Sequence, residues 1–250
     1  MEDRNSPSLA EKTCLITGGS RGIGRALCLA FAQAGAKVAF TYSKHDEDAE
    51  ETRSLLAMWG DPLVYKGSVA DSKHVQLTVK DLVSKWGRID VLVNNAAINQ
   101  MLPLALLEEE DWDRLIDINL KGVYLFSRAV CRFMIPKRKG HILNLGSFAS
   151  ERFVETPLHY AAAKSGLRGF TEALAIEVGK YNILVNLLAP GLLDEGLSTL
   201  VPQHRVKEYQ EQSAMGRLGR TEEIARIACF LVSDENTFMT GSKILADGGL

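Results

Sequence analysis

The sequence predicts a single α/β domain in which a doubly wound parallel sheet carries helices on both faces. Short apolar runs alternate along the chain with helix-length amphipathic segments. The runs are apolar throughout, as in strands that are buried on both faces of a parallel sheet. No repeat or linker interrupts this alternation, and strand–helix–strand units with right-handed crossovers follow from it.

The expected strands are short runs that are rich in apolar and β-branched residues. They cover residues 13–17, 37–42, 91–93, 142–145 and 183–188. The expected helices cover about 23–34, 46–58, 72–86, 111–135, 160–178 and 221–231. Gly35 ends the first helix as a C-cap. Residues 1–11 are polar, and we expect them to form a tail before one domain over residues 12–250.

The composition argues against several classes of protein. With 46% apolar and 24% charged residues, the chain can bury a large core. Its formal net charge of −2 gives no reason to expect a nucleic acid or an anionic membrane as partner. The four cysteines stand apart among apolar neighbours and are expected to be packing residues, and no metal site is expected. Residues 1–11 lack the apolar core of a signal peptide, and no apolar run reaches about 18 residues, so we expect a cytoplasmic protein.

A glycine-rich segment, residues 17–24, follows the first expected strand and leads into the first expected helix. It reads Thr17-Gly18-Gly19-Ser20-Arg21-Gly22-Ile23-Gly24. Glycines let backbone N–H groups approach a phosphate, and the positive end of the helix points to the same place. Dinucleotides bind at this position in doubly wound sheets. The alternative is a plain turn that needs glycine for its positive φ.

The spacing Gly-x-x-x-Gly-x-Gly, with the motifs that follow it, resembles the classical short-chain dehydrogenase/reductase family over about residues 12–249. In order, these motifs are Asn94-Asn95-Ala96-Ala97, Asn119, Ser147, Tyr160-Ala161-Ala162-Ala163-Lys164, Pro190-Gly191 and Asp247-Gly248-Gly249. The resemblance implies a Rossmann fold and an oxidoreductase that acts on C=O or CH–OH groups with a nicotinamide cofactor. It also implies a homotetramer that packs through the helices at 111–135 and 160–178.

Tyr160 and Lys164 lie four positions apart, so they share one face of the expected helix. An adjacent ammonium should lower the phenol's pKa from about 10 and make Tyr160 an acid/base, although the spacing alone is common on helix surfaces. Ser147 follows an expected strand and could hold the substrate oxygen; the alternative is a local turn hydrogen bond. By resemblance, Asn119 holds a water that completes a proton relay with Lys164, and Lys164 also binds the nicotinamide ribose. The expected catalytic residues are therefore Ser147, Tyr160, Lys164 and Asn119.

The cofactor is expected to be NADPH. Tyr42 stands where relatives that use NAD carry an aspartate, and no carboxylate follows before Asp46. Arg21 and Lys44 add cations for a 2′-phosphate, unless they are solvated surface charges. The expected cofactor contacts are Gly18, Ser20, Arg21, Gly22, Ile23, Gly24, Tyr42, Ser43, Lys44, Ser68, Val69, Asn95, Ala96, Tyr160, Lys164, Pro190 and Gly191.

Three residues depart from the family pattern. Ser68 replaces an aspartate that usually contacts the adenine, and Ala97 replaces a glycine. Glu195 replaces a threonine that commonly bonds the cofactor, so we expect its carboxylate to point away or the loop to be rearranged. These departures affect cofactor contacts and leave the four catalytic residues intact.

Within the family, the chain resembles 3-oxoacyl-[acyl-carrier-protein] reductases at 216–219, 222–225, 240–241 and 247–249. A basic cluster of Arg132, Lys137, Arg138 and Lys139 could meet an acidic acyl carrier protein, or could simply be a solvated helix end. Ile176 replaces a basic residue that some relatives use to dock the carrier, and residues 192–213 should form a substrate lid.

The first expectation for the substrate is therefore a β-ketoacyl thioester of fatty acid or polyketide biosynthesis. A free small ketone or secondary alcohol is the alternative. A non-catalytic nucleotide-binding protein and a methyltransferase of similar fold remain as other classes.

Overall fold

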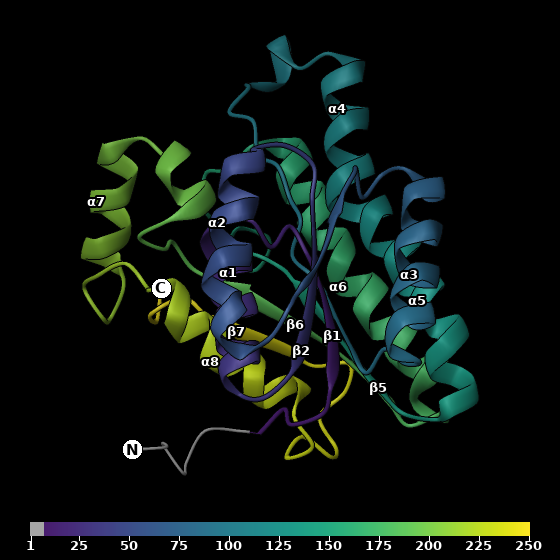
Figure 1. The fold of residues 1–250 in the computed structure, drawn as a ribbon. Helices are drawn as coiled ribbons and strands as arrows, with labels where there is room; N and C mark the ends of the chain where they lie inside the picture. Colours follow the sequence, from purple (N-terminus) through teal and green to yellow (C-terminus); the bar gives the residue numbers. More distant parts are fainter. Residues whose placement is uncertain (1–7) are drawn as a thin grey trace.

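The computed structural model describes residues 8–250, and residues 1–7 of the expected tail lie outside the described residues. Its centre is a seven-stranded sheet, in which every strand pairs in parallel with its neighbours (Figure 1). The strands are β1 (Thr13–Thr17), β2 (Lys37–Tyr42), β3 (Leu63–Lys66), β4 (Val91–Asn94), β5 (Gly140–Leu145), β6 (Ile183–Pro190) and β7 (Lys243–Ala246). Their order, β3-β2-β1-β4-β5-β6-β7, reverses direction between β1 and β4. The predicted doubly wound sheet is confirmed, and its switch point lies beside the glycine-rich loop.

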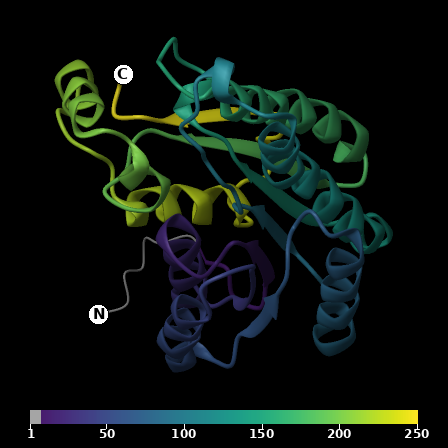
Figure 2. The same ribbon diagram turned by 90° about the horizontal axis from the view of Figure 1, so that it is seen from above.

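Helices cover both faces of the sheet, as predicted (Figure 2). On one face lie α1 (Gly22–Gln33), α2 (Asp46–Leu56) and α8 (Thr221–Val232). On the other lie α3 (Ser72–Trp86), α5 (Gly122–Lys137) and α6 (Leu158–Gly179). In β1, Ile16 packs into the first layer and Leu15 into the second, because successive side chains of a strand point to opposite faces. Burial on both faces explains why the strands contain no polar alternation.

The predicted helix over 111–135 is interrupted in the structure. It consists of α4 (Glu109–Ile116), a π-helical turn (Asp117–Lys121) and α5. A π turn inserts one residue into the helix and is frequent at functional sites. Here it contains Asn119, whose side chain is thereby turned into the protein.

Several elements were not predicted. They are the edge strands β3 and β7, helix α7 (Gln203–Gln212) within the expected lid, and the short 3₁₀ turns η1 (Ala57–Trp59), η2 (Leu104–Leu106), η4 (Phe148–Ser150) and η5 (Gly196–Leu200). Leu9, placed in the tail by its sequence position, is buried and donates its N–H to Ala34 O. Across residues 8–250, no helix has the length and apolarity needed to cross a membrane.

Candidate active site

A cleft of about 970 Å³ lies at the carboxyl ends of the strands, at the upper end of the size range of ligand sites. Every residue that was expected to bind the cofactor lines it, from Gly18 in the glycine-rich loop to Gly191 after β6. Ser147 lines it as well. Of the four expected catalytic residues, Asn119 alone does not line the cleft. Segments that are far apart in sequence therefore form one site, because parallel strands all end at this edge.

The glycine-rich loop and the start of α1 form a cradle for an anion. Gly18 and Gly22 adopt positive φ values of 69° and 52°. A Cβ on Gly24 would lie 1.9 Å from Gly18 O, so only glycine permits this close turn. Arg21, the N-cap residue of α1, makes no side-chain capping bond, and the first turn contains no acidic residue. The first N–H groups of α1 thus have no capping side chain and no acidic neighbour in the first turn. A pyrophosphate could accept hydrogen bonds from these N–H groups.

The end of β2 presents cations and hydroxyl groups to the cleft. Tyr42, Ser43 and Lys44 line it, whereas Asp46 does not. Instead, the Asp46 carboxylate accepts a hydrogen bond from Tyr42 Oη at 2.8 Å and pairs with Lys66 Nζ at 2.7 Å. Arg21 is 61% exposed and makes only a 3.9 Å contact with Asp48. This end of the cleft can therefore accept a further negative charge.

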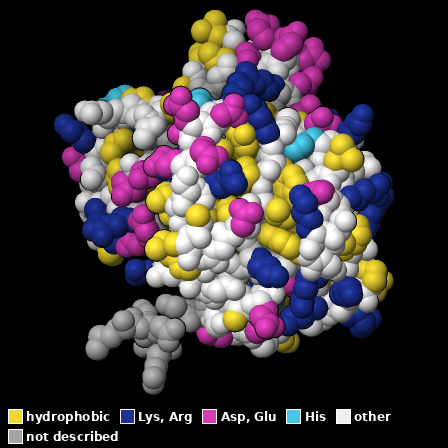
Figure 3. Space-filling view, in the orientation of Figure 1, with side chains coloured by type: hydrophobic (Ala, Val, Ile, Leu, Met, Phe, Trp, Pro, Cys, Tyr) yellow, Lys and Arg dark blue, Asp and Glu magenta, His cyan; other side chains and the backbone are white. Residues whose placement is uncertain are grey.

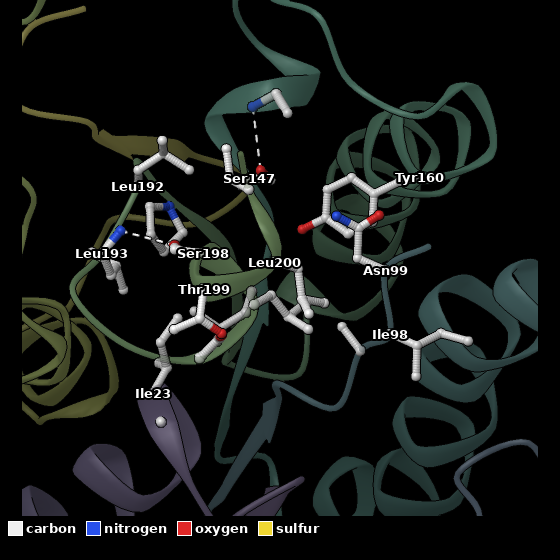
Figure 4. Close-up of a pocket in the computed structure, with 18 of the residues that line it drawn as sticks. Ile23, Ile98, Asn99, Ser147, Tyr160, Leu192, Leu193, Ser198, Thr199 and Leu200 are labelled. Atoms are coloured by element: carbon white, nitrogen blue, oxygen red, sulfur yellow. Dashed lines mark hydrogen bonds between the residues drawn. The ribbon is translucent and has the colours of Figure 1, made fainter. Parts of the chain in front are cut away.

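Ser147 and Tyr160 meet deep in the cleft (Figure 4). Ser147 lies two residues beyond the end of β5, and Tyr160 is in the first turn of α6, so both are held by regular elements. The Tyr160 hydroxyl points into the cavity toward Ser147 (Figure 4). Burial raises the pKa of Tyr160 above its usual value, and a hydrogen bond from the Ser147 side chain partly offsets this. At neutral pH the phenol is protonated and can donate its proton.

The expectation that Lys164 lowers the tyrosine's pKa does not hold for the protein alone. Lys164 is 3% exposed, and burial lowers its own pKa to about 8. Its Nζ donates to Leu145 O at 2.6 Å and lies 5.8 Å from the centre of the Tyr160 ring. Desolvation of both groups thus outweighs their attraction, since each loses its water shell on burial.

Asn119 lies outside the cleft and hydrogen-bonds to the backbone of Ile98, which lines it. Its Oδ1 accepts from Ile98 N and its Nδ2 donates to Ile98 O, both at 2.8 Å. Ile98 and Asn99 line the cleft beside Tyr160, and no motif in the sequence indicated either residue. Asn119 thus pairs with one backbone unit through its oxygen and one of its two N–H donors, and so holds this part of the wall in place.

Residues of the segment 192–213 line the outer rim of the cleft, but the ion pairs that join this rim were not predicted from the sequence. Arg205 of α7 pairs with Glu155, from the loop before α6, and with Glu208 at 2.8 Å. Residues 50 positions apart in the chain thus join across the mouth, and no local pattern could have indicated this. Gly196, in the segment expected to form the lid, lies against Gly22 of the glycine-rich segment. Glu195 is exposed and lies among the lining residues at the edge of the cleft.

The predicted basic cluster lies away from this cleft. It sits at the end of α5, immediately before β5, and hence at the amino edge of the sheet. Two of its members have structural partners: Arg138 donates to Lys180 O at 2.8 Å, and Lys139 pairs with Asp234 at 3.3 Å. Ile176 is 84% exposed on α6. As a single chain, the protein presents no basic surface from this cluster at the mouth of the cleft.

The fold and the cleft define a Rossmann-type protein in which Tyr160 and Lys164 lie together in a cleft at the switch point of the sheet. Comparison with known proteins agrees with this class. A family model described as enoyl-(acyl carrier protein) reductase matches residues 18–250. The 3-oxoacyl-[acyl-carrier-protein] reductase of Thermotoga maritima is 40% identical over 97% of this chain and 98% of its own length. The corresponding enzyme of Escherichia coli is 36% identical over 96% of this chain and 97% of its own length.

Solved structures show the same likeness. A putative short-chain alcohol dehydrogenase from Sinorhizobium meliloti superposes with a TM-score of 0.90 at 34% identity, covering 96% of each chain. A short-chain dehydrogenase/reductase from Serratia marcescens superposes with a TM-score of 0.90 at 33% sequence identity, covering 96% of this chain and 98% of its own. The chain therefore belongs to the short-chain dehydrogenase/reductase family, as an oxidoreductase acting on carbonyl or alcohol groups.

Proposed function

We propose that the protein reduces the carbonyl of a β-ketoacyl thioester to an alcohol with NADPH. The observation that carries this is the pairing of a protonated phenol with the Ser147 hydroxyl at the bottom of a dinucleotide-sized cleft. The names of the curated relatives support a 3-oxoacyl substrate attached to a carrier protein.

The cofactor, when bound, would supply the hydride that reduces the carbonyl carbon. In the proposed reaction, Ser147 donates a hydrogen bond that holds the substrate oxygen beside Tyr160. Tyr160 then gives its proton to that oxygen as negative charge develops there, and protonation by a fixed donor avoids the cost of reorganising water. Lys164 stands one helical turn further and, where charged, stabilises the phenolate that remains. Asn119 keeps the Ile98 backbone in place in the wall of the cleft.

NADPH rather than NADH is proposed from the chemistry at the end of β2. Arg21, Ser43 and Lys44 line this end of the cleft, and Asp46 is turned toward Tyr42 and Lys66. An exposed guanidinium such as that of Arg21 can pair with the two charges of a 2′-phosphate.

A free small ketone is the second candidate substrate, and two surface features favour it. Figure 3 shows acidic side chains gathered at the exposed end of α4, whose first turn contains Glu109, Glu110 and Asp111. These carboxylates would repel an acidic carrier from that end of the molecule. The exposed Ile176 likewise offers such a carrier no charge.

The substrate proposal is tested by following NADPH oxidation. The substrates are a β-ketoacyl thioester on acyl carrier protein, the same acyl group on a small thiol, a small free ketone and an enoyl thioester. The proposal expects the two β-ketoacyl thioesters to have the highest kcat/KM. Preference for the free ketone supports the second candidate, and preference for the enoyl thioester contradicts carbonyl reduction. Tyr160→Phe serves as the control for chemistry at this site.

A homotetramer built through α4, α5 and α6 belongs to the same proposal. Tyr124 on α5 and Leu158 and Ile176 on α6 are exposed apolar residues that such packing would cover. Sedimentation equilibrium of the purified chain tests this, and a monomer at micromolar concentration would contradict it.

A further inference from the structure

The turn at the C-terminus, Asp247–Gly249, contacts the loop that carries Ser147. Asp247 Oδ2 accepts from Arg152 Nε at 2.9 Å, and Asp247 Oδ1 accepts from Gly249 N at 3.1 Å. The side chain of Asp247 is only 6% exposed, whereas that of Arg152 is 39% exposed, so a buried carboxylate meets a partly solvated guanidinium. Neither Arg152 nor Asp247 lines the cleft. Any effect of the pair on the reaction must therefore pass through the loop.

The loop has few other long-range attachments. Between Ser147 and Arg152 it forms the single turn η4, which is closed by local bonds such as Ala149 N to Ser147 Oγ and Arg152 N to Phe148 O. Its other ion pair joins Glu151 to Lys243, at the start of β7. Glu151 and Arg152, which are neighbours in the loop after Ser147, thus bind residues at the start of β7 and just beyond its end. Both carboxylates are buried, so loss of either cation leaves an uncompensated charge.

The lid is attached to the same turn. Tyr209 of α7 donates its hydroxyl proton to Asp247 O at 2.6 Å, and its ring packs edge-on against Phe148 at 5.4 Å. A Cβ on Gly191 would lie 2.0 Å from Tyr209 Oη, so this contact is closely fitted. Beyond α7, Ala214 N and Met215 N donate to the carbonyls of Gly249 and Gly248. The residues that follow the lid helix therefore pair with the C-terminal segment.

We propose that the turn Asp247–Gly249 is a shared anchor that sets the position of Ser147 and couples it to the lid helix α7. Arg152 and Tyr209 are its two positioning residues. When α7 moves as the lid, the displacement reaches Asp247 through Tyr209 and then the serine loop through Arg152. Because a misplacement of about 1 Å at a reacting group can reduce a rate about 100-fold, a modest shift of this anchor alters turnover.

A double-mutant cycle tests the action of Arg152 through Ser147, and this test rests on the proposed carbonyl reduction. Arg152→Met should lower kcat about 10- to 100-fold and leave KM for NADPH within about twofold. In a Ser147→Ala background the same substitution should change kcat less than about twofold, because the group it positions is absent. Arg152→Lys should restore part of kcat. Equal losses in the two backgrounds, or full turnover by Arg152→Met, would overturn the proposal.

Arg53→Met is the matched control. Arg53 forms an exposed pair with Glu50 on α2 and does not line the main cleft, so turnover should stay unchanged.

Amide hydrogen exchange of the cofactor-free protein tests the coupling without any substrate. Tyr209→Phe should speed exchange in 203–212 and also in 148–152, and Arg152→Met should speed exchange in the same two segments. Changes confined to the mutated segment would overturn the coupling even if the enzyme is active. If exchange is coupled but no β-ketoacyl thioester is reduced, the proposed substrate fails and the anchor stands.

Discussion

Lys164 Nζ donates to the carbonyl of Leu145 at 2.6 Å and lies 5.8 Å from the Tyr160 ring centre, so it is bound to the strand rather than to the phenol. A buried ammonium with a single protein acceptor is only partly compensated for the water it has lost. This accounts for the lowered pKa of Lys164, about 8, against the ordinary value of 10.5. The buried ammonium of Lys164 therefore reduces the stability of the cofactor-free protein.

Replacing this lysine should therefore stabilise the free protein while removing its activity. The unfolded chain keeps its proton up to about pH 10.5 and the folded protein only up to about pH 8. The folded state thus bears the cost of the charge below pH 8 and is relieved of it as the pH rises toward 10.5. The free energy of unfolding of Lys164→Met should exceed that of the wild type by on the order of 3 kcal/mol at pH 7 and by much less at pH 10.

Urea unfolding at the two pH values measures this difference. Lys80→Met, at an exposed position of α3, is the control and should show no such dependence on pH. A Lys164→Met protein that is less stable than the wild type at pH 7 would contradict the assignment of a costly buried charge.

Loss of the phenol should stop the chemistry and spare cofactor binding. Tyr160→Phe should lower kcat for reduction by about 100- to 10,000-fold, as expected when a general acid is removed. The Kd for NADPH, measured by fluorescence titration, should change little, because a large dinucleotide has many other contacts along the cleft. Comparable turnover by a folded Tyr160→Phe variant would exclude this tyrosine as proton donor.

The sequence predicted the parts of the molecule whose signals are local. Strands β1 and β2 and helix α3 have the predicted bounds, because apolar runs and glycine stops mark them directly. Strands β3 and β7 are short, lie at the edges of the sheet and are partly exposed, so their short runs gave no clear signal of a buried strand. The π turn at Asn119 was missed because the helix pattern continues through it.

The same distinction holds for the site. Residues that were expected to bind the cofactor line one cleft, since most of them follow a strand at the same edge and Tyr160 and Lys164 reach it from α6. Contacts between distant segments, such as Glu155 with Arg205 and Arg152 with Asp247, had no signal in the sequence. The ionisation of Tyr160 and Lys164 also depends on burial, which spacing on a helix cannot supply.

Cofactor choice should depend on Arg21. If its guanidinium pairs with a 2′-phosphate, Arg21→Ala should lower kcat/KM for NADPH about 10- to 100-fold and leave that for NADH unchanged. Arg53→Ala, on the exposed face of α2 and outside the main cleft, is the matched control. Steady-state kinetics with both cofactors decide the point, and equal losses for NADH and NADPH would argue against 2′-phosphate recognition.

Acid should destabilise the protein through His141, at the opposite edge of the sheet from the cleft. Burial, together with the nearby Lys12 ammonium, lowers the pKa of His141 to about 4, despite Asp234 at 4.0 Å. The unfolded chain takes up this proton below about pH 6.5, so stability falls as the pH drops from 6.5 toward 4, by about 3 kcal/mol in all. His141→Asn should flatten this part of the curve of unfolding free energy against pH. His204→Asn, at an exposed position on α7, should leave the curve unchanged, and an unaltered slope in the His141 variant would assign the acid sensitivity to other groups.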